Sequence, residues 1–127
     1  MLKRLTFVAE LTGRLNDRAE VCKPYGYFPN DAPFVYPIIV DTARITCSKE
    51  HFAKAILAEG IGLNPHYRYL VSDWPWLKSY LPDDFSTPNA RAMRDRSFML
   101  YLNENYGTSE SADIAKAIGK VEKHFAR

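Results

Sequence analysis

The chain has 127 residues, of which 46% are hydrophobic and 25% charged, proportions typical of a single folded domain rather than of a disordered chain or a fibre. Its 17 basic and 15 acidic residues are dispersed along the sequence and give a net charge of +2, which argues against nucleic-acid binding through a basic patch. No apolar run approaches the roughly 18 residues of a membrane span, and the two cysteines fit neither a disulfide framework nor a zinc site, so we expect a cytoplasmic protein without a metal.

The N-terminal segment is predicted to be a helix. Its apolar residues recur at steps of three and four and therefore share one face; they are Leu2, Leu5, Val8, Leu11 and Leu15. Residues 21–35 are predicted to form an irregular connector, because prolines interrupt any regular structure there.

Residues 36–41 are rich in β-branched side chains and predict a buried strand. Pro37 has no backbone N–H, so we expect it at the start of this strand or on an edge of the sheet. Ser48 is placed to cap a helix that stops at Gly60. Residues 63–69 form a polar and aromatic stretch that predicts a strand or an extended loop.

The last third of the chain predicts two helices around a second strand. Pro75 suits a first helical turn, and residues 89–96 are compatible with a short helix. Residues 97–102 are apolar and predict a second buried strand. Thr108 or Ser109 is expected to cap a last helix whose apolar residues also share one face. This order predicts an α+β fold, a small, mainly antiparallel sheet covered by helices on one face.

Five segments carry a likeness to a known family. They are the strand around residues 34–41, the helix ending in Ala58-Glu59-Gly60-Ile61, the extended Asn64-Pro65-His66-Tyr67, and the strand of residues 97–103 followed by the helix from Ser109 to Phe125. In this order they resemble the C-terminal small domain of the DegT-type sugar aminotransferases, which depend on pyridoxal phosphate. The resemblance implies that residues 1–20 are an interdomain helix and that residues 21–127 are the small domain.

The resemblance also implies where the chemistry resides. Such enzymes transfer an amino group from glutamate to a nucleotide-linked keto-sugar, and their large domain supplies the catalytic lysine and binds the cofactor. We therefore expect this chain alone to be inactive, with no catalytic, cofactor-binding or metal-binding residue. Its lysines, such as Lys54, Lys116, Lys120 and Lys123, are expected on solvent-facing helix positions. The expected partner is the missing large domain or a second copy in a homodimer.

The candidate substrate-binding residues lie in the extended stretch after Gly62. The resemblance implies that Asn64, His66, Tyr67 and Arg68 line the edge of the cleft that the small domain closes over the nucleotide sugar. The alternative is structural, with His66 and Tyr67 packed against the sheet edge and hydrogen-bonded to the backbone.

Three further groups each have a functional and a structural interpretation. Trp74 and Trp76 could stack on a sugar or a nucleotide, but we expect core packing. Arg91, Arg94 and Arg96 could bind a diphosphate, but we expect a solvated helix face paired with Asp95. His51 and His124 are expected at the surface.

Two other functions compete for the whole chain. The first is a stand-alone interaction module that binds a protein through Trp74, Trp76 and Tyr80. The second, an independent hydrolase, is disfavoured because no nucleophile, base and orienting acid stand in a recognisable set.

Overall fold

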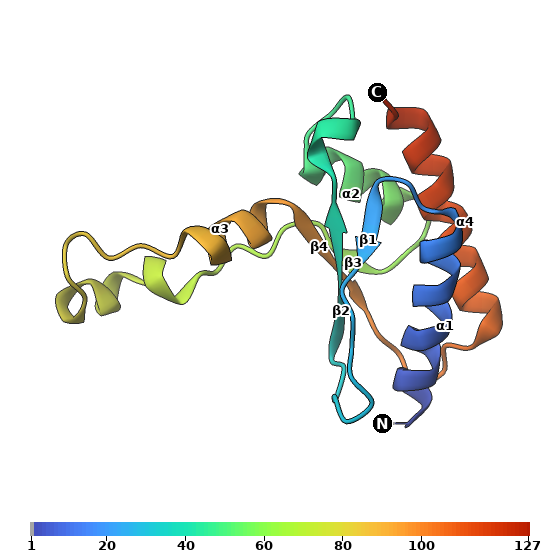
Figure 1. Ribbon diagram of the computed structural model, residues 1–127, viewed down its shortest axis with the longest axis horizontal. Coiled ribbons are helices and arrows are strands. Elements are labelled where there is room, and N and C mark those ends of the chain that lie inside the picture. The colour runs from blue at the N-terminus through green and yellow to red at the C-terminus, as the bar shows by residue number, and fades with distance from the viewer. Residues whose placement is uncertain (1) are drawn as a thin grey trace.

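The chain folds into one sheet, one layer of helices and a long projecting arm, as the computed structural model shows for residues 2–127 (Figure 1). The elements in chain order are α1 (Leu2–Arg18), β1 (Cys22–Pro24), β2 (Val35–Val40), η1 (Thr42–Arg44), α2 (Lys49–Ala58), β3 (Leu63–Asn64), η2 (Val71–Asp73), η3 (Pro75–Tyr80), α3 (Pro88–Asp95), β4 (Ser97–Tyr101) and α4 (Thr108–Phe125). The labels η mark short 3₁₀ helices.

The four strands form one antiparallel sheet in the order β1-β2-β4-β3. At its centre, Tyr36 lies opposite Leu100 and Ile38 lies opposite Phe98. All four of these side chains are buried and point to the same side, as the period of two along a strand requires. The predicted antiparallel α+β fold is therefore confirmed.

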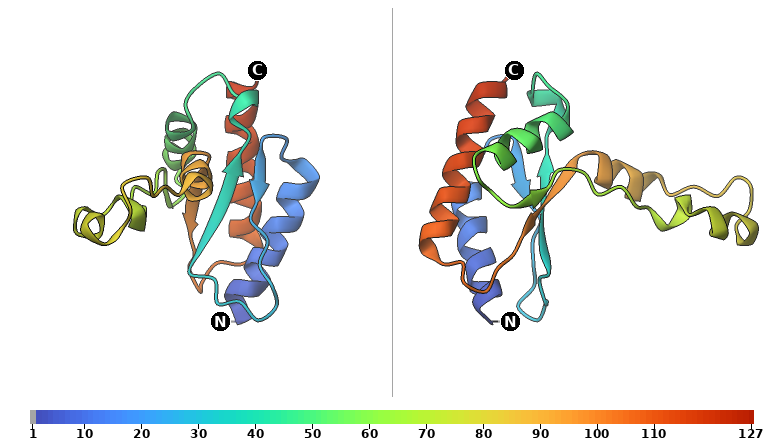
Figure 2. Two further views of the ribbon diagram at one scale, coloured as in Figure 1. Left: turned by 60° about the vertical axis from the view of Figure 1, so that its left-hand side comes forward. Right: turned by 180° about the vertical axis from the view of Figure 1, so that it is seen from behind.

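All the long helices cover that one side of the sheet. Helices α1 and α4 lie side by side, and α2 packs against α4, β3 and β4. Figure 2 shows the three of them on the same side. The largest fully buried side chains of this layer include Leu11 and Leu15 of α1, Phe52 and Ile56 of α2, and Ile118 of α4. They recur at helical spacing, so the predicted amphipathic helices supply the core.

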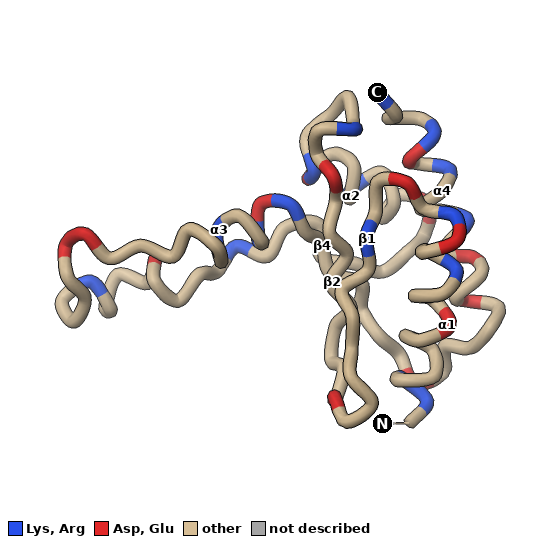
Figure 3. The backbone as a smooth tube through the Cα atoms, in the orientation of Figure 1, with Lys and Arg blue, Asp and Glu red and all other residues tan. Residues whose placement is uncertain are grey.

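The other side of the sheet has no helix layer, and we call it the open face. It is formed by alternate residues of the two central strands, Val35, Pro37 and Ile39 of β2 and Met99 and Tyr101 of β4, which are half-buried or exposed. Neither β2 nor β4 contains a charged residue (Figure 3). The open face is therefore apolar over the two central strands, and the exposed Lys23 of β1 flanks it beside Ile39.

Residues 71–96 leave the sheet as an arm that projects from the side of the open face (Figures 1 and 2). The outgoing and returning segments are joined by a 2.7 Å hydrogen bond between the hydroxyls of Ser72 and Thr87 and by a 2.7 Å ion pair between Arg91 and Asp73. No residue of the range 71–96 is buried. The arm consequently has no hydrophobic core of its own.

A buried carboxylate fastens the connector to the helix layer. Glu122 of α4 accepts backbone hydrogen bonds from Glu20 (3.1 Å), Val21 (3.0 Å) and Cys22 (2.8 Å). These three N–H groups lie at the start of β1, a strand that the sequence prediction of an irregular connector missed. The strand forms because β2 offers it a partner over Cys22–Pro24.

Three local predictions need correction. Pro37 lies in the middle of β2, a central strand. Its carbonyl accepts a hydrogen bond from the backbone N–H of Tyr25, just past the end of β1. The N–H that proline lacks would therefore face Tyr25, where the pairing of β1 with β2 has already ended. The last helix is capped by Gly107, whose N–H donates to the Glu110 carboxylate at 2.8 Å. Trp74 and Trp76 lie on the arm, 37% and 63% exposed, rather than in the core.

Ser48 caps α2 as predicted, since its hydroxyl accepts from the backbone of His51, and Gly60 follows the helix end with φ of +90°. Within residues 2–127, none of the helices has both the length and the apolar character needed to cross a bilayer.

Candidate functional site

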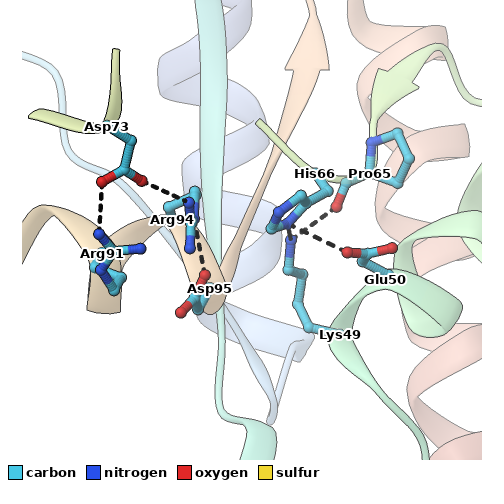
Figure 4. A network of polar contacts seen from close by, with 8 residues as sticks. All are labelled: Lys49, Glu50, Pro65, His66, Asp73, Arg91, Arg94 and Asp95. Atoms are coloured by element: carbon cyan, nitrogen blue, oxygen red, sulfur yellow. Dashed lines mark hydrogen bonds and ion pairs between the residues drawn. The ribbon is translucent and has the colours of Figure 1, made fainter. Parts of the chain in front are cut away.

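The candidate site lies where the chain passes from β3 towards the arm. Asn64 ends β3, and its side-chain oxygen accepts from the backbone N–H of His66 at 3.1 Å, a turn typical of asparagine. This turn directs His66 towards the first turn of α2, which contributes Lys49 and Glu50 (Figure 4). The extended stretch and the helix start, predicted separately, therefore meet at one place.

Lys49 is the central residue of this contact. It is 6% exposed, and its Nζ donates to the carbonyl of Pro65 at 2.8 Å and lies 3.0 Å from Nδ1 of His66. Burial lowers the pKa of this ammonium below its ordinary value, while the nearby carboxylates of Glu50 and Asp95 act in the opposite direction. A buried lysine held by two partners is fixed in position rather than free in solvent.

The pKa of His66 is also lowered, first by burial and then by the charge of Lys49, with Glu50 opposing the shift. A pKa below 6.5 favours the neutral imidazole at pH 7, and in the tautomer with its proton on Nε2, Nδ1 accepts a hydrogen bond from Nζ of Lys49. Glu50 lies 3.6 Å from Nδ1, but this contact becomes an ion pair only when His66 is protonated.

Arginines and aspartates from the base of the arm form the second half of the network (Figure 4). Arg94 donates from Nε to Asp95 at 2.8 Å and lies 3.8 Å from Asp73, which also pairs with Arg91 at 2.7 Å. The hydrogen bond from Arg94 lowers the pKa of the Asp95 carboxyl. The predicted pairing of these arginines on a helix face is confirmed for Arg94 and Asp95, and Asp73 is an additional partner.

Two of the four predicted site residues come together and two do not. Asn64 and His66 share the turn described above. The ring of Tyr67 is 45% exposed and meets Tyr69 edge to face at 6.3 Å. Arg68 is exposed, and among residues 2–127 the structure gives it neither a hydrogen bond nor an ion pair. These two side chains are thus available on the surface next to the His66 turn.

An open hollow of about 410 Å³ lies over the network, lined by Ser48, Lys49, Glu50, His66 and Asp95. It combines donors, acceptors and both signs of charge in a volume that suits a small polar ligand. Its lining can therefore form hydrogen bonds with a small polar molecule.

The residues that line this hollow do not fit pyridoxal phosphate. The cofactor needs an available lysine and a site for its phosphate. Here the Nζ of the buried Lys49 is occupied by Pro65 and His66, and the hollow above it contains the carboxylates of Glu50 and Asp95, which repel a phosphate. Among residues 2–127, no three side chains of His, Cys, Asp and Glu gather in a way that could hold a metal ion.

Sequence reasoning missed Lys49 and Glu50. The lysines named in the prediction, Lys54, Lys116, Lys120 and Lys123, are exposed as expected, but Lys49 is not. One signal in the sequence could have identified Lys49. The helix dipole disfavours a positive charge in the first turn of a helix, so a lysine at this position indicates a stabilising contact elsewhere.

The strand order and the one-sided helix layer define an α+β domain. Three solved structures with this fold are of one protein, assigned as a sugar aminotransferase, Spr1654 of Streptococcus pneumoniae. The similarity has a TM-score of 0.75 and 15% identity for the PMP form, 0.75 and 17% for the PLP form, and 0.72 and 16% for the apo form.

Each of these matches covers 97% of this chain but 31% of the S. pneumoniae chain. The present chain therefore spans about a third of the length of that protein. No family model and no curated protein matches the sequence. The expected resemblance to a small domain of a sugar aminotransferase is confirmed at the level of the fold.

Proposed function

We propose that this chain is the small domain of a DegT-type sugar aminotransferase and acts together with a larger domain that binds pyridoxal phosphate and carries the catalytic lysine. The observation that carries the proposal is the match of nearly the whole chain to one part of a sugar aminotransferase more than three times as long. Residues 1–20 would be the helix next to the domain boundary, and residues 21–127 the domain itself. The complete enzyme would be a cytoplasmic dimer.

In this role the His66 turn presents polar groups to a keto-sugar nucleotide. Asn64 and Lys49 fix the position of His66, and the exposed side chains of Tyr67 and Arg68 stand beside it. The neutral imidazole can hydrogen-bond a sugar hydroxyl, and the Arg68 guanidinium suits a diphosphate. The amino transfer itself takes place on the cofactor in the larger domain, and this chain alone is inactive.

The test separates the two halves of the reaction. The chain is combined with the cofactor-binding domain of a sugar aminotransferase from the same source, either mixed or as one polypeptide, and single-turnover absorbance follows amino transfer from glutamate and then to the keto-sugar nucleotide. We expect His66→Ala and Arg68→Ala to slow the second half-reaction and to leave the first unchanged. Lys116→Ala, an exposed change in the helix layer, is the matched control.

Equal slowing of both half-reactions by His66→Ala would contradict the substrate-binding role. Formation of a covalent complex between pyridoxal phosphate and this chain alone, seen as a stable absorbance band that is lost in Lys49→Met, would contradict the division of labour between the domains.

The interaction-module alternative is favoured by one observation, the exposure of Trp76 (63%) and Tyr80 (78%) on the arm. Loss of binding to an unrelated protein on Trp76→Ala, without any effect of a cofactor-binding domain, would support it.

A further inference from the structure

We propose that the open face and the arm together form the surface that docks the larger, cofactor-binding domain, and that the helix layer takes no part in the contact. This inference rests on the proposed function and adds to it the location of the interface. It follows from three surfaces of the molecule that differ in polarity.

The arm needs a covering partner. Its range 71–96 contains no buried residue, whereas Trp76, Tyr80 and Phe85 are 63%, 78% and 48% exposed. Ordering a residue costs about 1–2 kcal/mol of conformational entropy, and a segment that buries no apolar side chain recovers little of it. Large aromatic side chains are also the residues that most often dominate binding interfaces.

The open face needs a partner for a separate reason. An antiparallel sheet with one side in water normally carries polar residues on that side. Here Val35, Pro37 and Ile39 of β2 lie beside Met99 and Tyr101 of β4. The arm projects from this same side of the sheet (Figure 2). The open face and the arm therefore border one angle, into which a partner could fit.

The helix layer, by contrast, is suited to solvent. Lys116 and Lys123 of α4 are exposed, Lys120 pairs with Glu59 at 2.8 Å, and Glu10 of α1 pairs with Arg14 at 3.0 Å. Charged residues recur along α1 and α4 (Figure 3). Burying such a layer would require every charge to find a new partner.

The comparison with known structures supports the larger domain as the occupant. The match leaves out 3% of 127 residues, or about four, so it spans the arm as well as the sheet. In the S. pneumoniae protein, 69% of the chain lies outside the match, since 31% is covered. That remaining chain is the part available to cover the open face and the aromatic side chains of the arm.

The polar site lies at the inner corner of this angle. Asn64 of β3 is opposite Met99 of β4 in the sheet, which places it next to the open face, and Asp73 and Arg94 mark the base of the arm. A domain seated in the angle would therefore contact the apolar side chains of the open face and the exposed aromatic side chains of the arm, and close over the His66 turn.

The experiment measures binding of the cofactor-binding domain of a sugar aminotransferase from the same source to this chain. Three variants are compared with the unmodified chain: Trp76→Ser with Tyr80→Ser on the arm, Met99→Gln on the open face, and Lys116→Glu with Lys123→Glu on the helix layer as the matched control. We expect the first two to weaken binding by about tenfold or more and the control to leave it within about twofold. Circular dichroism verifies that each variant is folded.

Hydrogen exchange on the unmodified proteins provides an independent readout if a variant fails to fold. We expect the domain to protect residues 71–96 and to leave the outer faces of α1 and α4 unprotected. Protection or weakened binding confined to the helix layer would overturn the inference but leave the proposed function intact. Absence of binding to any such domain would overturn both. A stable dimer of this chain alone that dissociates with Trp76→Ser and Tyr80→Ser would assign the surface to a second copy and overturn the inference.

Discussion

The carboxylate of Glu122 in α4 and the backbone N–H of Cys22 in β1 lie 2.8 Å apart, although 100 residues separate them along the chain. The same side chain accepts from Val21 and Glu20 and is 6% exposed. One acidic residue of the last helix thus satisfies the donors at the start of the first strand.

Replacing Glu122 with Ala should lower the free energy of unfolding by about 3 kcal/mol, because buried N–H groups lose a charged acceptor. Urea denaturation measures the change. The comparison variant is Glu59→Ala, which removes a partner from the surface pair with Lys120 and should cost less than about 1 kcal/mol. Similar losses in the two variants would show that the Glu122 contacts contribute no more than a surface pair.

The stability of the chain should depend on His66 in mildly acidic solution. Its pKa in the folded protein lies below the ordinary value of 6.5, so the unfolded chain binds the proton more tightly. The contribution is complete above pH 6.5 and is lost as the pH falls through the folded pKa. Denaturation of His66→Gln between pH 5 and 7 should show a shallower loss of stability than the unmodified chain.

The charge of Lys49 contributes to that shift. In Lys49→Met the pKa of His66, followed by the NMR shift of its ring, should rise, because a neighbouring positive charge has been removed. A pKa that falls or does not move would mean that Lys49 is not charged next to His66.

Two glycine substitutions should have opposite effects. Gly60 has φ of +90°, a conformation that costs an L-residue about 1 kcal/mol or more, so Gly60→Ala should destabilise the protein. Gly119 lies inside α4, and no atom outside its own helical turn lies within 4 Å of the place where an alanine methyl group would sit, so Gly119→Ala should stabilise by up to about 1 kcal/mol. Thermal unfolding of both variants measures the difference, and a shared sign would contradict the helix-end role of Gly60.

The arm aromatics should contribute little to the stability of the isolated chain. Trp76→Ala should cost less than about 1 kcal/mol, whereas Phe98→Ala, which empties a fully buried position, should cost about 3–5 kcal/mol. Both tryptophans lie on the arm, so acrylamide should quench the native fluorescence strongly. Weak quenching would place the indoles in a buried environment.

The helices and the two central strands could be predicted because their patterns are local. The spacing of Leu11 and Leu15, or of Ile114 and Ile118, reports the face that a helix buries. Strand β1 escaped prediction because its three residues depend on β2 and on Glu122, which lies at the other end of the chain.

The tryptophans were misplaced for a related reason. Trp74 and Trp76 have the composition of a core, and a sequence pattern cannot show that the segment leaves the body of the protein. The site was predicted in part, since the turn between Asn64 and His66 is local, while Lys49 reaches His66 only after α2 has packed against β3.

The outermost strands of the sheet are very short. β1 has three residues and includes Pro24, and β3 has two. Each rim therefore offers few free backbone groups onto which a foreign strand could add. A molecule that displays such an apolar sheet is consequently protected against growing into fibrils by edge-to-edge association, and any neighbour must bind it through side chains rather than by extending the hydrogen-bonded ladder.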